Sequence, residues 1–116
     1  MNVPFVDFSQ QYQAIKKEIN VGLDEVFQKA SFILGPQVKT FEEEFSFYCG
    51  AKYGIGVNSG TDALYLALAS LHVGKGDEVI LPSFTFIATA LCVSYVGAKP
   101  VFVDVENETY NIDANK

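Results

Sequence analysis

Apolar residues recur at three- and four-residue steps over the first half of the chain, which is the spacing of one face of a helix. Over residues 10–30 they form one stripe, and most of the charged residues fall away from it. A second stripe covers residues 37–48. Between the two, Gly35 can stop a helix and Pro36 suits the first turn of the next one. The pattern predicts two amphipathic helices with apolar positions at Tyr12, Ile15, Ile19, Leu23, Val26, Phe27 and Ala30, and at Val38, Phe41, Phe45 and Tyr48.

From about residue 54 the pattern changes to short apolar runs that alternate with helical stretches. This alternation is typical of parallel strands covered by helices on both faces. It predicts strands at 54–57, 78–81 and 100–105, and helices at 62–71 and 87–96.

The change of pattern divides the chain into a helical segment, residues 1–53, and a βαβαβ segment, residues 54–116. We expect the fold class to be α/β, with a mostly parallel sheet. The helix expected at 62–71 is apolar nearly all round, so it should be buried on more than one side.

Charge and composition narrow the classes of function. The net charge is -6, and all 8 basic residues are lysines. A nucleic-acid surface needs clustered basic side chains and favours arginine, so we expect no nucleic-acid partner. No apolar run approaches the ~18 residues of a membrane span, and the N-terminus has no signal-peptide core. We expect a soluble, cytoplasmic protein without a membrane partner.

The cysteines and the single histidine do not form a metal motif. Cys49 and Cys92 lie far apart without a CxxC spacing, and a zinc cage needs more ligands than His72 can add. We expect no metal site. We interpret the cysteines as free, buried thiols in a reducing compartment, and His72 as a cap at a helix C-terminus. The acidic run at 42–44 is interpreted as a solvated helix face.

The first candidate site is the junction between the strand expected at 54–57 and the next helix. Its residues Ser59, Gly60, Thr61 and Asp62 are small or polar. Free backbone N–H groups and the helix dipole attract an anion to such a helix start, and Gly60 permits close approach. The same residues also suit plain capping, with Ser59 or Thr61 as N-cap and Asp62 in the first turn. Spacing alone leaves phosphate binding and capping both open.

A nicotinamide-binding interpretation is disfavoured. Gly54, Gly56 and Gly60 resemble the GxGxxG fingerprint, but the last glycine comes one residue late and the first two fall in the expected strand. Asp77 and Glu78 precede the second strand, whereas the fingerprint has its acid at the end of that strand.

A second candidate site lies at residues 82–89, where another strand end passes into a helix and carries Phe84 and Phe86. Carboxyl ends of strands meet at the ligand crevice of a doubly wound sheet. An aromatic ring there can stack on a flat cofactor ring, and the alternative is that both rings belong to the core. No acid, base and nucleophile lie close enough in sequence to suggest a hydrolytic triad, and no catalytic residue is assigned within the chain.

Several blocks of sequence, taken together and in order, carry a specific family resemblance. The strongest are SGTDAL at 59–64, GDEVI at 76–80 and PSFTFIATA at 82–90; PFVD at 4–7, FILGP at 32–36, FEEEF at 41–45, GAKPVFVDV at 97–105 and TYNID at 109–113 accompany them. With these blocks, essentially the whole chain resembles the DegT-type (StrS-like) family of pyridoxal-phosphate-dependent sugar aminotransferases.

The resemblance implies the three-layer αβα architecture of pyridoxal-phosphate (PLP) enzymes of fold type I and a homodimer. It implies transfer of an amino group from glutamate to a nucleotide-linked keto sugar, whose product enters lipopolysaccharide, surface glycans or antibiotics. By the family pattern, the backbone around Gly60, Thr61 and Asp62 holds the phosphate of pyridoxal 5'-phosphate, and Phe86 stacks on the pyridine ring. Residues 32–35 are a weaker candidate for substrate contact.

Family members are much longer than this chain, so it is expected to be the N-terminal part of such an enzyme and inactive by itself. The Schiff-base lysine, the acid that pairs with the pyridine nitrogen and the second domain come later in the family. None of the lysines here occupies that position: Lys16, Lys17, Lys29, Lys39, Lys52, Lys75, Lys99 and Lys116. Two alternatives stay open, a PLP-dependent sugar dehydratase of the same family and a non-catalytic anion-binding or regulatory module.

Two rules disagree about the strand expected at 54–57. Consecutive βαβ strands usually lie side by side, but in the family's fold the first strand lies apart from the next two. If it keeps that position, the chain alone has unpaired strand edges and exposed apolar faces, and we expect it to be unstable or to associate.

Overall fold

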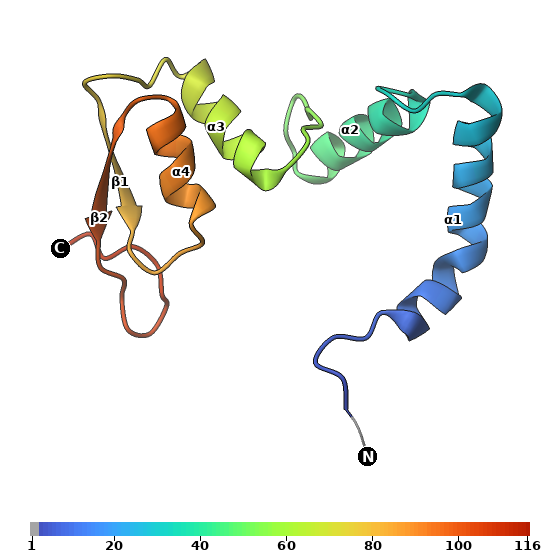
Figure 1. Ribbon diagram of the computed structural model, residues 1–116, viewed down its shortest axis with the longest axis horizontal. Coiled ribbons are helices and arrows are strands. Elements are labelled where there is room, and N and C mark those ends of the chain that lie inside the picture. The colour runs from blue at the N-terminus through green and yellow to red at the C-terminus, as the bar shows by residue number, and fades with distance from the viewer. Residues whose placement is uncertain (1–2) are drawn as a thin grey trace. The chain divides into compact units, whose positions relative to one another are not determined.

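A computed structural model describes residues 3–116 of the chain (Figure 1). The chain forms two compact units, Met1–Gly56 and Val57–Lys116. Among the described residues, no helix is both long and apolar enough to cross a membrane.

The first unit begins with helix α1, Ser9–Lys29, close to the range expected from the apolar stripe. Asp7 marks its start, because Asp7 Oδ1 accepts a hydrogen bond from the Ser9 amide at 2.8 Å. Hydrogen bonding by the side chain and backbone of Ser9 lowers the pKa of the Asp7 carboxyl. The helix ends at Ala30, where the predicted helix also ends, and Ala30 adopts the left-handed conformation with φ +50°.

Helix α2, Pro36–Tyr48, starts as expected with Pro36 in its first turn. Gly35 is the N-cap of this helix, and a Cβ there would lie 2.6 Å from the Ser31 carbonyl oxygen, so only glycine fits. The stripe on α2 includes Phe41 and Phe45, whose rings stack with centroids 5.4 Å apart.

The strand expected at 54–57 does not form. Instead, the Gly56 amide donates a hydrogen bond to Glu42 Oε1 on α2 at 2.6 Å. A strand needs a neighbouring strand to take up its backbone groups, and within residues 3–116 none pairs with this segment. The prediction of three strands was therefore wrong by one.

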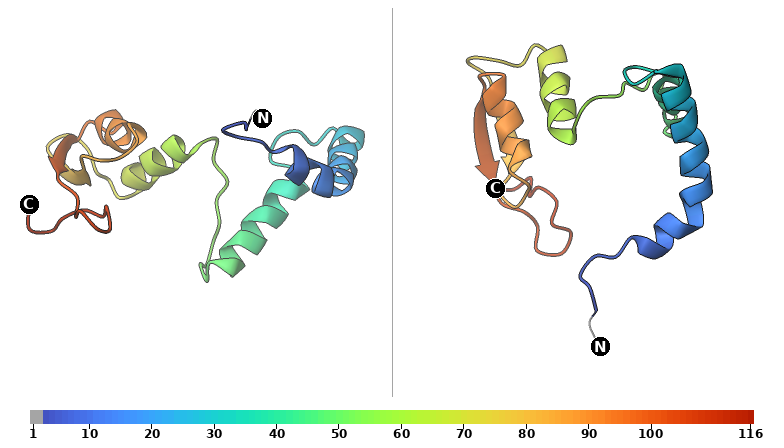
Figure 2. Two further views of the ribbon diagram at one scale, coloured as in Figure 1. Left: turned by 90° about the horizontal axis from the view of Figure 1, so that it is seen from below. Right: turned by 45° about the vertical axis from the view of Figure 1, so that its right-hand side comes forward.

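The second unit is built from a helix followed by one β–α–β crossover (Figure 2). Its two strands are parallel neighbours, in register from Glu78↔Lys99 to Pro82↔Val103. The elements are α3 (Gly60–Ser70), β1 (Glu78–Pro82), α4 (Ala88–Tyr95) and β2 (Lys99–Val103).

The core of the second unit lies between α4 and one face of the sheet. Its buried members are Leu81, Cys92, Val93 and Ala98, and Tyr65 and Leu68 of α3 pack against them. Neighbouring residues of a strand point to opposite faces: Leu81 is 3% exposed, whereas Ile80 is 63% exposed. Within the described residues a helix covers only one face of the sheet, so the third layer of the expected architecture is not made by these residues.

Helix α3 is less buried than its composition suggested. It has no buried residue, and Leu64 and Leu66 are 43% and 48% exposed. The expectation of burial on more than one side was wrong for this chain, because within the described residues α4 is the only element that packs on α3.

The end of α3 is a Schellman motif in which His72 takes the place that glycine usually has. The His72 amide donates to the Ala69 carbonyl at 3.0 Å, and the Val73 amide to Leu68 at 3.1 Å. His72 has φ +59°, in the left-handed region. The histidine does stand at a helix C-terminus as expected, and its backbone conformation is what closes the helix.

After β2 the chain forms a small hairpin. The strand stops at Val103, short of the predicted residue 105, and Val105 instead makes an antiparallel bridge with Ile112. The two cysteines are both free; Cys92 is buried as expected, but Cys49 is exposed because it follows α2 on the surface of the first unit.

Candidate functional site

The anion site expected at the start of α3 begins with a well-formed N-cap. Ser59 has an extended backbone, and its Oγ accepts a hydrogen bond from the Asp62 amide at 3.1 Å. The same hydroxyl donates to Asp62 Oδ2 at 2.9 Å. The capping interpretation is therefore right for Ser59, and the Asp62 carboxylate is tied to the serine.

This cap leaves two amides of the first turn free. The Asp62 amide is bonded to Ser59 Oγ, and the Ala63 amide donates to the Ser59 carbonyl at 3.0 Å. Within residues 3–116, no acceptor bonds the amides of Gly60 or Thr61. A Cβ built on Gly60 meets no atom within 4 Å, so the space over this residue is open. Capping and anion binding are thus compatible, because they use different amides.

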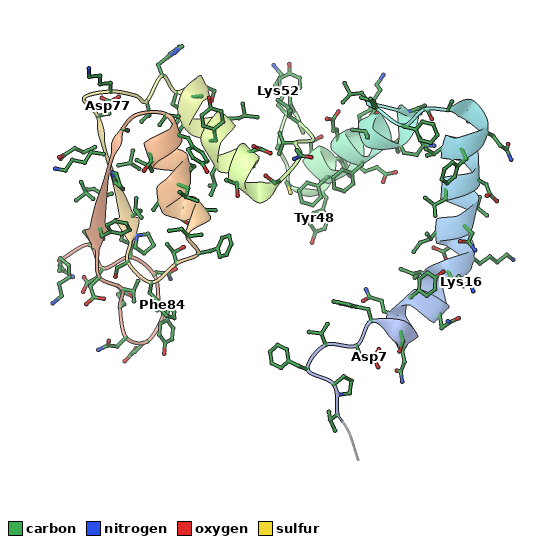
Figure 3. All side chains as sticks on the ribbon, in the orientation of Figure 1. Asp7, Lys16, Tyr48, Lys52, Asp77 and Phe84 are labelled. Carbon is green, nitrogen blue, oxygen red and sulfur yellow. The ribbon has the colours of Figure 1, made fainter. Side chains whose placement is uncertain are left out.

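The aromatic residues of the second junction do not belong to the core of this chain. Phe86 is 76% exposed and Phe84 is 71% exposed. The Phe84 ring packs against the Tyr110 ring of the hairpin after β2, with the ring centroids 5.8 Å apart. Figure 3 shows Phe84 beside that loop. Phe86 makes no aromatic pair within the described residues. Its ring is open to a flat ligand.

The chain brings the two candidate segments to one end of the second unit. Helix α3 begins at the end where β1 and β2 finish, and the loop at 83–87 leaves β1 at that same end (Figures 1 and 2). Carboxyl ends of parallel strands and helix N-termini gather there, as in other α/β sheets. Cofactor roles for Gly60, Thr61, Asp62 and Phe86 remain predictions.

An apolar hollow of about 240 Å³ lies between α3, β1 and α4. Leu64, Leu68, Val79, Leu81 and Cys92 are among its lining residues, and none of the lining side chains is charged. A phosphate would meet no positively charged side chain in this hollow and would lose its hydration there. The start of α3 is therefore the better anion site.

An ion pair of this unit lies at the opposite end of the strands. Lys99 Nζ is 2.6 Å from Glu78 Oε1, and these residues begin β2 and β1. The hydrogen bond and the charge of Glu78 raise the pKa of the Lys99 ammonium. Positive potential at the carboxyl ends therefore comes from the helix start and not from this lysine.

Residues 32–35, the weaker candidate for substrate contact, lie in the first unit between α1 and α2. Phe32, Ile33 and Leu34 are 63%, 86% and 80% exposed, and Leu34 has φ +49°. A contact with substrate at these residues remains a prediction.

The charge pattern does not reveal the role of Glu42. The acidic run at 42–44 is expected to be solvated, yet Glu42 is half-buried and its Oε1 accepts a hydrogen bond from the Gly56 amide. The signal was the pair Gly54 and Gly56, since two glycines with a single residue between them mark a place where another backbone comes close.

Comparison with known proteins gives a consistent result. Residues 13–116 match the model of the DegT/DnrJ/EryC1/StrS aminotransferase family. The chain is 51% identical over 113 residues to a pleiotropic regulatory protein of Geobacillus stearothermophilus, covering 97% of this chain and 30% of the relative. It is 50% identical over 108 residues to a UDP-N-acetyl-3-dehydro-alpha-D-glucosamine 3-aminotransferase of Acidithiobacillus ferrooxidans, covering 93% of this chain and 29% of that protein.

The fold agrees with the sequence match. The crystal structure of NtdA from Bacillus subtilis with bound cofactor PMP superposes with a TM-score of 0.92 at 35% identity, over 99% of this chain and 27% of that one. The chain thus spans about 30% of the length of these proteins and has the fold of the matching part. It belongs to the DegT/DnrJ/EryC1/StrS aminotransferase family.

Proposed function

We propose that this chain is part of a PLP-dependent aminotransferase that moves an amino group from glutamate to a nucleotide-linked keto sugar. The observation that carries the proposal is the start of α3, where Ser59 closes the cap and leaves the amides of Gly60 and Thr61 free. Family membership and the named activity of the Acidithiobacillus relative support the choice of reaction.

The residues of the second unit fit the cofactor. The amides of Gly60 and Thr61 would donate to phosphate oxygens, and the helix dipole would add favourable potential. The open space over Gly60 admits the phosphate, and the exposed ring of Phe86 would stack on the pyridine. An anion-binding role for the Asp62 amide requires the Ser59 hydroxyl to turn away from it. When bound, PLP supplies an electron sink for breaking bonds at the amino-bearing carbon.

The rest of the enzyme is proposed to lie on a longer polypeptide. The chain spans about 30% of its relatives, and the family's lysine is expected outside residues 1–116. The open sheet face at Ile80 and the half-exposed α3 support further packing partners. The 116-residue chain alone should not turn over, and the complete enzyme is expected to be a homodimer. Its product would serve lipopolysaccharide, surface-glycan or antibiotic synthesis.

The test uses the complete protein purified with PLP. Absorbance of the bound cofactor should shift when glutamate is added, and 2-oxoglutarate should be released in proportion. A nucleotide-linked keto sugar should then restore the original spectrum and gain the amino group. A complete protein that binds PLP but gives no spectral change with glutamate would exclude the aminotransferase; sugar dehydration without amination would identify the related dehydratase.

One observation favours a second candidate. The relative from Geobacillus stearothermophilus, 51% identical, is named a pleiotropic regulatory protein. A regulatory module would need only the anion site at α3. This second candidate function predicts that the complete protein binds phosphate compounds but releases no 2-oxoglutarate from glutamate.

A further inference from the structure

The two glycines before the anion-binding turn lie directly against helix α2 at Glu42. A Cβ on Gly54 would be 2.5 Å from the Glu42 carbonyl oxygen, with the Glu42 carbonyl carbon and Cα also within 3.3 Å. A Cβ on Gly56 would be 3.2 Å from Glu42 Oε1 and 3.5 Å from Val38 Cγ1. The contact to Gly54 is with rigid backbone, so glycine is required for this approach.

A side-chain hydrogen bond joins the same two segments. Glu42 Oε1 accepts a hydrogen bond from the Gly56 amide at 2.6 Å. Gly56 stands three residues before the N-cap Ser59. The carboxylate therefore holds the backbone at Gly56, and the free amides of Gly60 and Thr61 follow a few residues later in the sequence.

The neighbouring acids of the run do not share this role. Glu43 forms an i,i+4 pair with Lys39 at 3.9 Å, and its side chain is 68% exposed. The Glu43 carboxylate makes no hydrogen bond and no ion pair with residues 54–56 within the described residues, which makes Glu43 a matched control on the same helix.

We propose that Glu42 is a positioning residue for the phosphate-binding turn: by anchoring the Gly56 amide it orders the approach to the free amides of Gly60 and Thr61. This inference rests on the proposed function. A turn that is already ordered loses less entropy when it closes on a ligand, so the anchor should increase affinity for the phosphate-bearing cofactor. It should leave affinity for pyridoxal, which lacks the phosphate, unchanged.

The test measures PLP binding to the complete enzyme by absorbance, with pyridoxal as the matched ligand. Glu42→Ala should raise the Kd for PLP about fivefold, as expected for loss of one hydrogen bond. Glu42→Gln keeps an acceptor at the same place and should restore most of the affinity. Glu43→Ala should bind like the wild type. Hydrogen exchange of the Gly56 amide can be measured without enzyme activity. It should be faster in Glu42→Ala than in the wild type, and unchanged in Glu43→Ala.

The outcomes separate the two proposals. A wild type that does not bind PLP overturns the proposed function and this inference with it. A wild type that binds, with an unchanged Kd in Glu42→Ala, overturns this inference only. Equal weakening of PLP and pyridoxal also overturns it, because general damage would act on both ligands. Should Glu42→Ala fail to fold, Glu42→Asp replaces it, since the shorter carboxylate cannot reach the Gly56 amide in place.

Discussion

Glu78 and Lys99 begin the two parallel strands at one register position, and their side chains meet with Oε1 and Nζ 2.6 Å apart. The Lys99 amide also donates to the Asp77 carbonyl at 2.9 Å, so backbone and side chains join the strands at the same end. Both side chains of the pair are more than half exposed, and solvent screens their attraction.

The first prediction concerns the pH range in which this pair acts. Glu78 raises the pKa of the Lys99 ammonium above its ordinary value of 10.5. A raised pKa in the folded state means that the pair stabilises fully at lower pH, and that its contribution is lost only as the pH rises through the folded-state pKa. In an NMR titration, Lys99 should deprotonate above pH 10.5 and at a lower pH in Glu78→Gln. Identical titrations in the two proteins would contradict the role of Glu78.

His72 and Gly97 give a second, matched prediction. Both end helices with positive φ, +59° and +81°, but only Gly97 does so without a side-chain penalty. His72→Gly should stabilise the end of α3 by about 1 kcal/mol and slow exchange of the Val73 amide. Gly97→Ala should do the opposite at the Ala98 amide after α4. Faster exchange at Val73 in His72→Gly would show that the imidazole itself holds the motif.

A third prediction contrasts two glycines of the first unit. Gly22 lies inside α1, and a Cβ there meets nothing within 4 Å, so Gly22→Ala should stabilise the helix by about 1 kcal/mol. Gly54→Ala must displace the segment from the Glu42 backbone, which lies 2.5 Å from the added Cβ. Amide exchange should slow across α1 in the first variant and quicken at Gly56 in the second. Normal protection of Gly56 in Gly54→Ala would argue against the close approach.

The fourth prediction tests the aromatic ring proposed to cover the cofactor. In the complete enzyme, Phe86→Ala should weaken retention of PLP by roughly 1–2 kcal/mol, the range for a stacked aromatic. Phe86→Tyr and Phe86→Trp should retain it. Phe84→Ala is the control, because the Phe84 ring packs against Tyr110 and has no proposed contact with the cofactor. Dialysis followed by absorbance measures the remaining cofactor, and an unchanged value in Phe86→Ala would remove this residue from the site.

The 116-residue chain by itself should associate. Both strands of its sheet are edge strands, and Ile80 and Phe102 are 63% and 55% exposed. Free edges and apolar surface recruit other chains. Sedimentation should show oligomers that grow with concentration, and PLP should bind poorly. A monodisperse monomer with a sharp, cooperative unfolding transition would refute this expectation.

Local patterns in the sequence predicted the helices and the two strands that formed. The stripes of α1 and α2 repeat over three turns or more, and periodicity of that length is a property of the segment alone. The conformation at helix ends was harder to predict from the sequence. Ala30 adopts a left-handed conformation, although the residue usually found in that conformation is glycine. The strand at 54–57 depended on a partner elsewhere in space, and a nearby carboxylate on α2 took its amide instead.

The candidate site was predictable only in outline. Small, polar residues from Ser59 to Asp62 identify a helix start that suits an anion, but spacing alone could not say which amides the cap would use. That division follows from the Ser59 rotamer and its two bonds with Asp62. Likewise, the exposure of Phe86 depends on what packs beside it, which the alternation of residues does not encode.

The compact crossover from Glu78 to Val103 has a kinetic consequence. Its strands are joined by α4 and the loops on either side of it, and the buried residues Leu81, Cys92, Val93 and Ala98 all fall inside it. The paired residues Glu78 and Lys99 are 21 positions apart in the sequence, and the entropy cost of closing a loop is smaller for a shorter loop. We expect this stretch to act as the folding nucleus, with α3 docking afterwards through Tyr65 and Leu68. On the ribosome, the nucleus can therefore assemble as soon as β2 has emerged.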